Sequence, residues 1–179
     1  ILALGLYILA RLWLISDVEL GKDEAVYWYW GQHLDASYAL LPFAMLKLAH
    51  ALIPHQEWFL RLPSILLGTL STALLYRLCT IQGLAECTAR WAAAAFALSH
   101  WTWHTSSYLH PDGLLVPCWL LALYLARQAE TTRELRSYVL MGIASGCVVL
   151  CKYSGAFLVG GLGLWIFFTQ LDKERWRLL

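Results

Sequence analysis

The sequence has few charged residues and no asparagine. Only 14% of its 179 residues are charged, whereas an ordinary soluble domain has about a quarter. The net charge is +1 and the basic residues are scattered along the chain, which argues against nucleic-acid binding. Without asparagine the chain contains no N-glycosylation sequon.

The sequence also lacks any Cys-x-x-Cys pair, tandem repeat or low-complexity linker. Its cysteines are Cys79, Cys87, Cys118, Cys147 and Cys151. Most of them lie within apolar runs, which favours buried packing residues over a disulfide framework or a metal site.

Long apolar runs dominate the sequence, since 60% of its residues are hydrophobic. They predict an integral membrane protein that is all-α, a polytopic bundle of about six transmembrane helices. Ile1–Ile15 is the end of the first helix, and we expect Arg11 within it to snorkel to the interface. The other predicted spans are Arg61–Cys79, Ala89–Ser107, Gly113–Arg127, Ser137–Cys151 and Gly155–Leu171.

Two shorter segments follow the first span and the polar loop after it. Asp23–Asp35 predicts a helix that is too aromatic and too short to cross a bilayer. Tyr38–Ile53 reaches only about 24 Å of a roughly 30 Å hydrocarbon core, and it contains Pro42. We therefore predict two interfacial or re-entrant helices in the first external loop. If Tyr38–Ile53 crossed the membrane instead, Asp23 would move to the opposite face.

The distribution of Lys and Arg near the helix ends sets the predicted orientation. One side of the predicted bundle is much richer in basic residues, and we assign it to the cytoplasm. Its basic residues are Arg77, Arg90, Arg127, Arg133, Arg136, Lys173, Arg175 and Arg177. The other, external side then collects Asp23, Glu24, Arg61, Asp112 and Lys152.

Glycines in the last two predicted spans indicate closely packed helices. Gly142 and Gly146 form a Gly-x-x-x-Gly spacing, and small residues let transmembrane backbones approach each other. We expect the same close approach of backbones at the glycines Gly155, Gly160, Gly161 and Gly163.

Carboxylates, an arginine and a lysine on one membrane face could together carry out group transfer. A carboxylate can act as general base on an acceptor hydroxyl. Arg and Lys can hold a phosphate, and aromatic rings beside them can stack on a sugar. In the plainer alternative, Asp23 and Glu24 are ordinary acidic residues at the start of a helix.

Other candidate residues also have plainer alternatives. Asp112 follows Pro111 and could cap the next helix, and Arg61 and Lys152 could be snorkelling residues. His100 and His104 are four residues apart, but no third ligand is fixed by local spacing. We therefore interpret them, with the histidine at position 110, as packing residues.

Four short motifs occur in an order that resembles a known group of enzymes. They are Asp23-Glu24 with Tyr27-Trp28, Arg61-Leu62-Pro63-Ser64, Pro111-Asp112-Gly113-Leu114 and Lys152-Tyr153-Ser154-Gly155. The sequence is similar to the N-terminal part of the GT-C glycosyltransferases related to dolichyl-phosphate-mannose–protein mannosyltransferases and lipid A aminoarabinose transferases. The resemblance covers essentially residues 1–179, which we interpret as part of a longer protein.

The resemblance implies a polyprenyl-phosphate sugar donor and an acceptor hydroxyl on protein or lipid, at the external membrane face. It implies that Asp23 is the base, with inversion at the anomeric carbon, and that Glu24 positions it or binds a divalent metal ion. Asp112 matches a second acidic position, and Tyr27 is a candidate substrate contact. Arg61 and Lys152 are our candidates for the donor phosphate, from charge and side of the membrane.

One departure concerns the segment after the acidic loop, where family members often carry His-Pro-Pro after a Tyr. Here the chain reads Tyr38-Ala39-Leu40-Leu41-Pro42-Phe43, so substrate contacts from this segment are in doubt. We expect a bacterial inner membrane location with the site facing the periplasm.

Two other classes of function require features that the sequence lacks. A transporter or flippase-like bundle would also use charges and broken helices, but it predicts internal repeats that the sequence lacks. A membrane protease built on Ser154 has no neighbouring histidine to activate it.

Overall fold

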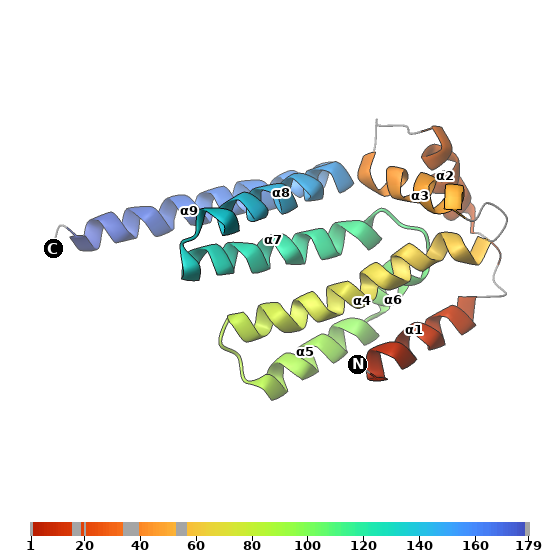
Figure 1. Cartoon of the computed structure of the whole chain (residues 1–179), viewed down its shortest axis with the longest axis horizontal. Coiled ribbons are helices and arrows are strands. Elements are labelled where there is room, and N and C mark those ends of the chain that lie inside the picture. The colour runs from red at the N-terminus through yellow and green to blue at the C-terminus, as the bar shows by residue number, and fades with distance from the viewer. Residues whose placement is uncertain (1, 16–18, 20, 34–39, 53–56, 178–179) are drawn as a thin grey trace.

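The computed structural model describes residues 2–15, 19, 21–33, 40–52 and 57–177. These residues form nine α-helices and one 3-10 turn, without a strand among them, so the all-α prediction is confirmed for this part of the chain (Figure 1). The helices are α1 (Leu2–Ile15), α2 (Lys22–His33), α3 (Leu40–Leu52), α4 (Glu57–Ile81), α5 (Glu86–Leu98), α6 (His100–Ser107), α7 (Asp112–Thr132), α8 (Leu135–Cys151), η1 (Tyr153–Gly155) and α9 (Ala156–Arg177).

The long helices α4, α7, α8 and α9 run roughly along one direction, and α2 and α3 lie together at one end of them (Figure 1). Helix α7 packs between α4 and α8, while α1 and α5 pack on other sides of α4. Helix α3 contacts both α4 and α8. The short helices therefore close the end of the bundle at which α4 and α7 begin and α8 ends.

Few of these helices are long and apolar enough to cross a bilayer by themselves. Within the described residues, Leu60–Ile81 alone meets both criteria, and α6 and α7 meet them together although they are bent by 117°. The other apolar helices are shorter: Gly5–Ile15, Leu40–Leu52, Leu135–Cys151 and Tyr153–Thr169. The polytopic bundle of about six spans therefore stays a prediction.

The two predicted short helices are confirmed, because α2 and α3 occupy their places. Their predicted outer residues, Asp35, Tyr38 and Ile53, lie outside the described residues, as does most of the loop Ser16–Lys22. Helix α3 has only 13 residues, about 20 Å at 1.5 Å per residue. This length is again too short to cross a bilayer.

The predicted continuous span Ala89–Ser107 is wrong, because the helix breaks at Ser99. This residue has an extended backbone with ψ of 143°, and it ends α5 and begins α6. Its hydroxyl accepts a hydrogen bond from the backbone N–H of Thr102 at 3.3 Å. Serine favours such a cap because its side chain satisfies an otherwise free N–H of the new helix. A second break follows α6, and there α6 and α7 form an elbow of 117°.

Arg11 does not snorkel to an interface. Its side chain is fully buried and donates hydrogen bonds to the hydroxyls of Tyr7 and Ser106. Its guanidinium also lies 4.6 Å from the centre of the Trp103 ring. Hydrogen bonding and a cation–π contact let a buried arginine keep its charge, so Arg11 holds α1 against α6.

Two buried clusters form the core. One joins α7, α8 and α9 around Ala122, Val148 and Cys151. The other lies under α2 and contains Phe43 and Leu60, with Leu46 and Leu109 beside them. Removing this apolar surface from water or lipid headgroups fixes α2 and α3 on the end of α4.

The cysteines are free thiols, as expected, but they are not all buried. Cys79 and Cys151 are buried, Cys118 and Cys147 are half-buried, and Cys87 is exposed.

Of the glycines predicted to allow close packing, Gly155 alone is tightly packed within the described residues. An added Cβ at Gly142, Gly146, Gly160, Gly161 or Gly163 would meet nothing within 4 Å, so close packing at these positions within the chain was wrongly predicted. At Gly155 it would lie 2.6 Å from the backbone oxygen of Val148, which confirms that position. The sequence did not indicate Gly68, where a Cβ would collide with the side chain of Ser106.

Gly68→Ala should lower the free energy of unfolding by about 1–3 kcal/mol, because the new methyl group forces α4 and α6 apart. The matched control is Gly142→Ala, which adds the same group in open space and should be neutral or slightly stabilising. Chemical unfolding of the purified variants in detergent measures both. Equal effects at the two positions would contradict the tight contact.

Candidate functional site

A buried ion pair between Glu24 and Arg61 lies where α2 meets α4. Glu24 is in the first turn of α2, and Arg61 lies one turn into α4. The guanidinium donates from Nη2 to Oε2 at 2.6 Å and from Nε to Oε1 at 2.9 Å. The side chains are 5% and 0% exposed, so this two-point geometry forms away from water and is correspondingly strong.

The ion pair also holds two backbone segments. Glu24 Oε1 accepts the backbone N–H of Leu109 at 2.9 Å, and Oε2 accepts that of Gly21 at 2.9 Å. Arg61 donates to the carbonyl of Glu19 at 2.9 Å. Burial by itself would raise the pKa of Glu24, but hydrogen bonds from Arg61, Leu109 and Gly21 hold this pKa below its ordinary value. Glu24 is therefore charged and fully engaged at neutral pH.

These contacts change the roles predicted for Glu24 and Arg61. Arg61 neither snorkels nor faces a space where a donor phosphate could bind, because it is fully buried against Glu24. Glu24 uses both carboxylate oxygens on protein groups. The pair is a structural clamp that positions its neighbour Asp23 and the segment before α7.

A second ion pair joins α7 to the end of α8. Lys152 Nζ lies 3.0 Å from Asp112 Oδ1. Asp112 is buried at the first position of α7, while about a third of the Lys152 side chain is exposed. The residue at the cap position is Pro111, and no side chain caps this helix. The alternative that Asp112 caps the helix is therefore wrong. Asp112 instead pairs with Lys152.

His110 connects this ion pair to α2. Its Nδ1 accepts the backbone N–H of Asp112 at 3.1 Å and lies 3.6 Å from Oδ2 of the same residue. Its ring meets the ring of Tyr27 edge-on, with centroids 5.8 Å apart. Burial lowers the pKa of His110, while the charges of Asp112 and Asp23 oppose this shift and that of Lys152 supports it. His110 thus lies within electrostatic reach of all three charges.

Asp23 occupies the exposed side of α2, next to the buried Glu24. Residues four apart share a helix face, so Asp23 and Tyr27 are neighbours. We use the name acid–lysine site for Asp23, Tyr27, His110, Asp112 and Lys152. Sequence reasoning missed His110 in this role, although its place directly before Pro111-Asp112 was a signal.

The residues do not fit a bound metal ion well. Within the described part of the chain, no three His, Cys, Asp or Glu side chains are grouped as metal ligands. His100, His104 and His110 form a row of rings with neighbouring centroids 6.4 and 6.1 Å apart. Both oxygens of Glu24, the residue predicted to bind a divalent ion, are occupied by protein donors.

Arg61→Leu should lower the free energy of unfolding by about 3–5 kcal/mol, because it leaves the Glu24 carboxylate buried without its partner. The double variant with Glu24→Gln should recover part of this loss. Since the pKa of Glu24 is lower in the folded state, its stabilisation is complete above its ordinary value of 4.5 and is lost as the pH falls below it. Chemical unfolding between pH 3 and 7 measures both effects.

The control for this prediction is the exposed pair Arg90–Glu86 on α5. Arg90→Leu should cause no measurable change, because an exposed ion pair is screened by solvent. If Arg61→Leu were equally harmless, the buried pair would not be the structural clamp.

Comparison with known proteins assigns the chain to a family. The sequence model of the family described as dolichyl-phosphate-mannose-protein mannosyltransferase matches residues 37–178. No curated protein and no solved structure matches the chain. The matched range contains Arg61, Asp112 and Lys152, whereas Asp23 and Tyr27 precede it, so the family model does not cover these two residues. Because the match covers most of its length, the chain belongs to the dolichyl-phosphate-mannose–protein mannosyltransferase family of GT-C type membrane glycosyltransferases.

Proposed function

We propose that the protein transfers a sugar from a polyprenyl-phosphate donor to a hydroxyl group of a protein acceptor, at the external face of a bacterial plasma membrane. The observation that carries this proposal is the acid–lysine site, in which α2, the α6–α7 elbow and the end of α8 bring two carboxylates, a histidine and a lysine together. Membership of the family supports the reaction class.

Asp23 is the proposed general base, and the structure supplies a reason to prefer it to Glu24. Its side chain is exposed, whereas Glu24 is buried in the structural clamp. An exposed carboxylate can meet an acceptor hydroxyl and take its proton. The acceptor oxygen then forms a bond to the anomeric carbon while the bond from that carbon to the phosphate oxygen breaks. The electron pair leaves with the polyprenyl phosphate, and the anomeric configuration inverts.

Lys152 is the proposed contact to the donor phosphate. Asp112 holds this lysine at 3.0 Å, and an ammonium group has three donors, so one can serve Asp112 and another a phosphate oxygen. Negative charge develops on the phosphate oxygen as the sugar leaves, and a fixed cation stabilises it there. Tyr27, which lies beside His110 on the Asp23 face of α2, is the proposed aromatic contact for the sugar.

The proposed orientation follows from charge. The opposite end of the bundle, where α4 and α7 end and α5 and α8 begin, carries the exposed residues Arg77, Arg90, Arg133 and Arg136. Basic residues concentrate on the cytoplasmic side of membrane proteins. The acid–lysine site at the other end then faces outward.

Asp23→Asn should lower kcat for sugar transfer by about 10²–10⁴-fold with little change in donor binding, since a missing general base affects the chemical step. Lys22→Gln is the matched control, because it changes a charge on the neighbouring exposed position. Transfer from polyprenyl-phosphate mannose to an acceptor peptide, measured with the purified protein, reports the rate. Wild-type turnover in Asp23→Asn would reject its role as base. Counterflow of the donor without product would favour a flippase.

Lys152→Gln should raise the KM for the donor by roughly tenfold or more, because it removes a charge-assisted hydrogen bond to the phosphate. Lys152→Arg keeps the charge and should restore part of the affinity. Steady-state kinetics at varied donor concentration separate this effect from that of Asp23→Asn. An unchanged KM in Lys152→Gln would place the phosphate elsewhere.

A further inference from the structure

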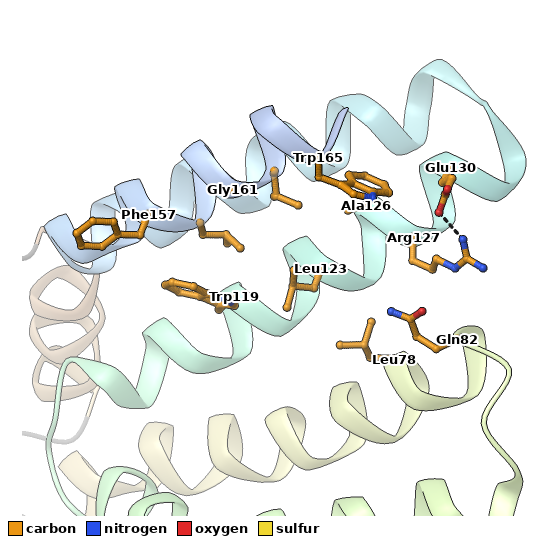
Figure 2. A pocket seen from close by; sticks show the side chains of 12 residues that line it. Leu78, Gln82, Trp119, Leu123, Ala126, Arg127, Glu130, Phe157, Gly161 and Trp165 are labelled. Atoms are coloured by element: carbon orange, nitrogen blue, oxygen red, sulfur yellow. Dashed lines mark hydrogen bonds and ion pairs between the residues drawn. The ribbon is translucent and has the colours of Figure 1, made fainter. Parts of the chain in front are cut away.

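A large cavity lies between α7 and α9, and its polar mouth is at the opposite end of the bundle from the acid–lysine site. It has a volume of about 660 Å³, within the range of about 300–1,000 Å³ typical of ligand sites. Helices α7 and α9 form its long walls and the end of α4 closes it from below in the view of Figure 2. Trp119, Leu123 and Phe157 line the apolar part, and Phe157 is 81% exposed, so the cavity opens to the outside.

The polar end of the cavity contains an incompletely paired cation. Arg127 Nη1 pairs with Glu130, but its Nε is buried without a hydrogen-bond partner. In Figure 2 the side chain of Gln82, at the end of α4, faces Arg127 across the mouth of the cavity. A phosphate oxygen could accept from the guanidinium and from the Gln82 amide, and arginine is well suited to phosphate oxygens.

The depth of the cavity distinguishes between two kinds of occupant. Its lining on α7 extends from Trp119 to Glu130, eleven residues or about 16 Å along the helix. One leaflet contributes about half of a roughly 30 Å hydrocarbon core. An acyl chain of one leaflet matches this depth, whereas a transmembrane helix would require a groove along the whole core.

The electrostatic surroundings favour an anionic headgroup. Arg77, Arg133 and Arg136 are exposed near the ends of the helices that surround the polar mouth. Basic pockets between helices at the cytoplasmic face bind the headgroups of anionic lipids. Glu130 balances the charge of Arg127 by pairing with Nη1, so the excess positive charge at this mouth comes from the exposed arginines.

We propose that this cavity binds an anionic glycerophospholipid of the cytoplasmic leaflet, with its phosphate at Arg127 and Gln82 and one acyl chain between α7 and α9. The site is separate from that of the sugar donor. Arg127 and Asp112 are 15 residues apart on α7, about 22 Å along the helix, so a phosphate at Arg127 cannot be the one that reacts beside Lys152.

Native mass spectrometry of the purified protein with added phosphatidylglycerol tests this proposal, with diacylglycerol as the lipid that lacks a phosphate. Phosphatidylglycerol should bind the wild type, and Arg127→Gln should weaken binding about tenfold. Arg136→Gln removes the same charge from an exposed position nearby and should leave binding almost unchanged. Thermal unfolding of each variant shows that it is folded.

Gly161→Leu provides a second variant that does not alter charge. It projects a side chain into the cavity, where an added Cβ meets nothing within 4 Å, and should abolish lipid binding. Gly160→Leu is the control on the same helix, since it is open but does not line the cavity. Equal lipid binding in Gly161→Leu and Gly160→Leu, or diacylglycerol binding as tight as that of phosphatidylglycerol, would overturn the proposal. Activity toward the sugar donor is not part of this readout.

Discussion

The structure depends on one buried ion pair, between Glu24 and Arg61. Two charges that leave water are expensive to bury unless geometry and further hydrogen bonds compensate, and here backbone N–H groups of Gly21 and Leu109 supply those bonds. The pair therefore fixes α2 to α4 and to the segment before α7 at the same time. With α2 fixed by its buried carboxylate, the neighbouring carboxylate of Asp23 is held at the exposed side, where chemistry can occur.

Two adjacent acidic residues thus differ in exposure, because consecutive residues of a helix point about 100° apart. The same division occurs on α7 and α8, where Asp112 is buried and orients Lys152, which is partly exposed. In both cases a buried carboxylate, Glu24 or Asp112, fixes the position of a more exposed charged neighbour. His110 links the two pairs through the N–H of Asp112 and the ring of Tyr27.

Much of the fold could be predicted from apolar runs and their lengths, including the two short helices before residue 53. The break at Ser99 could not, because a capping serine looks like any polar residue in a span. Asp112 and Lys152 were predicted to share one membrane face, and they form an ion pair. The buried state of Arg61 was missed, because a sequence shows that a charge is near an interface but not which carboxylate it meets. The close contact at Gly68 was missed for the same reason, because its partner Ser106 is remote in sequence.

The position of Lys152 in the chain has a consequence for how the protein matures. Its partner Asp112 precedes it by 40 residues, and a chain emerges from the ribosome in order, with its N-terminal parts folding first. Until α8 has packed against α7, Asp112 lacks the lysine that lies 3.0 Å from it in the folded chain. The pair of Asp112 and Lys152 therefore forms only after α8 has docked on α7, so the site is completed late in the synthesis of this part of the chain.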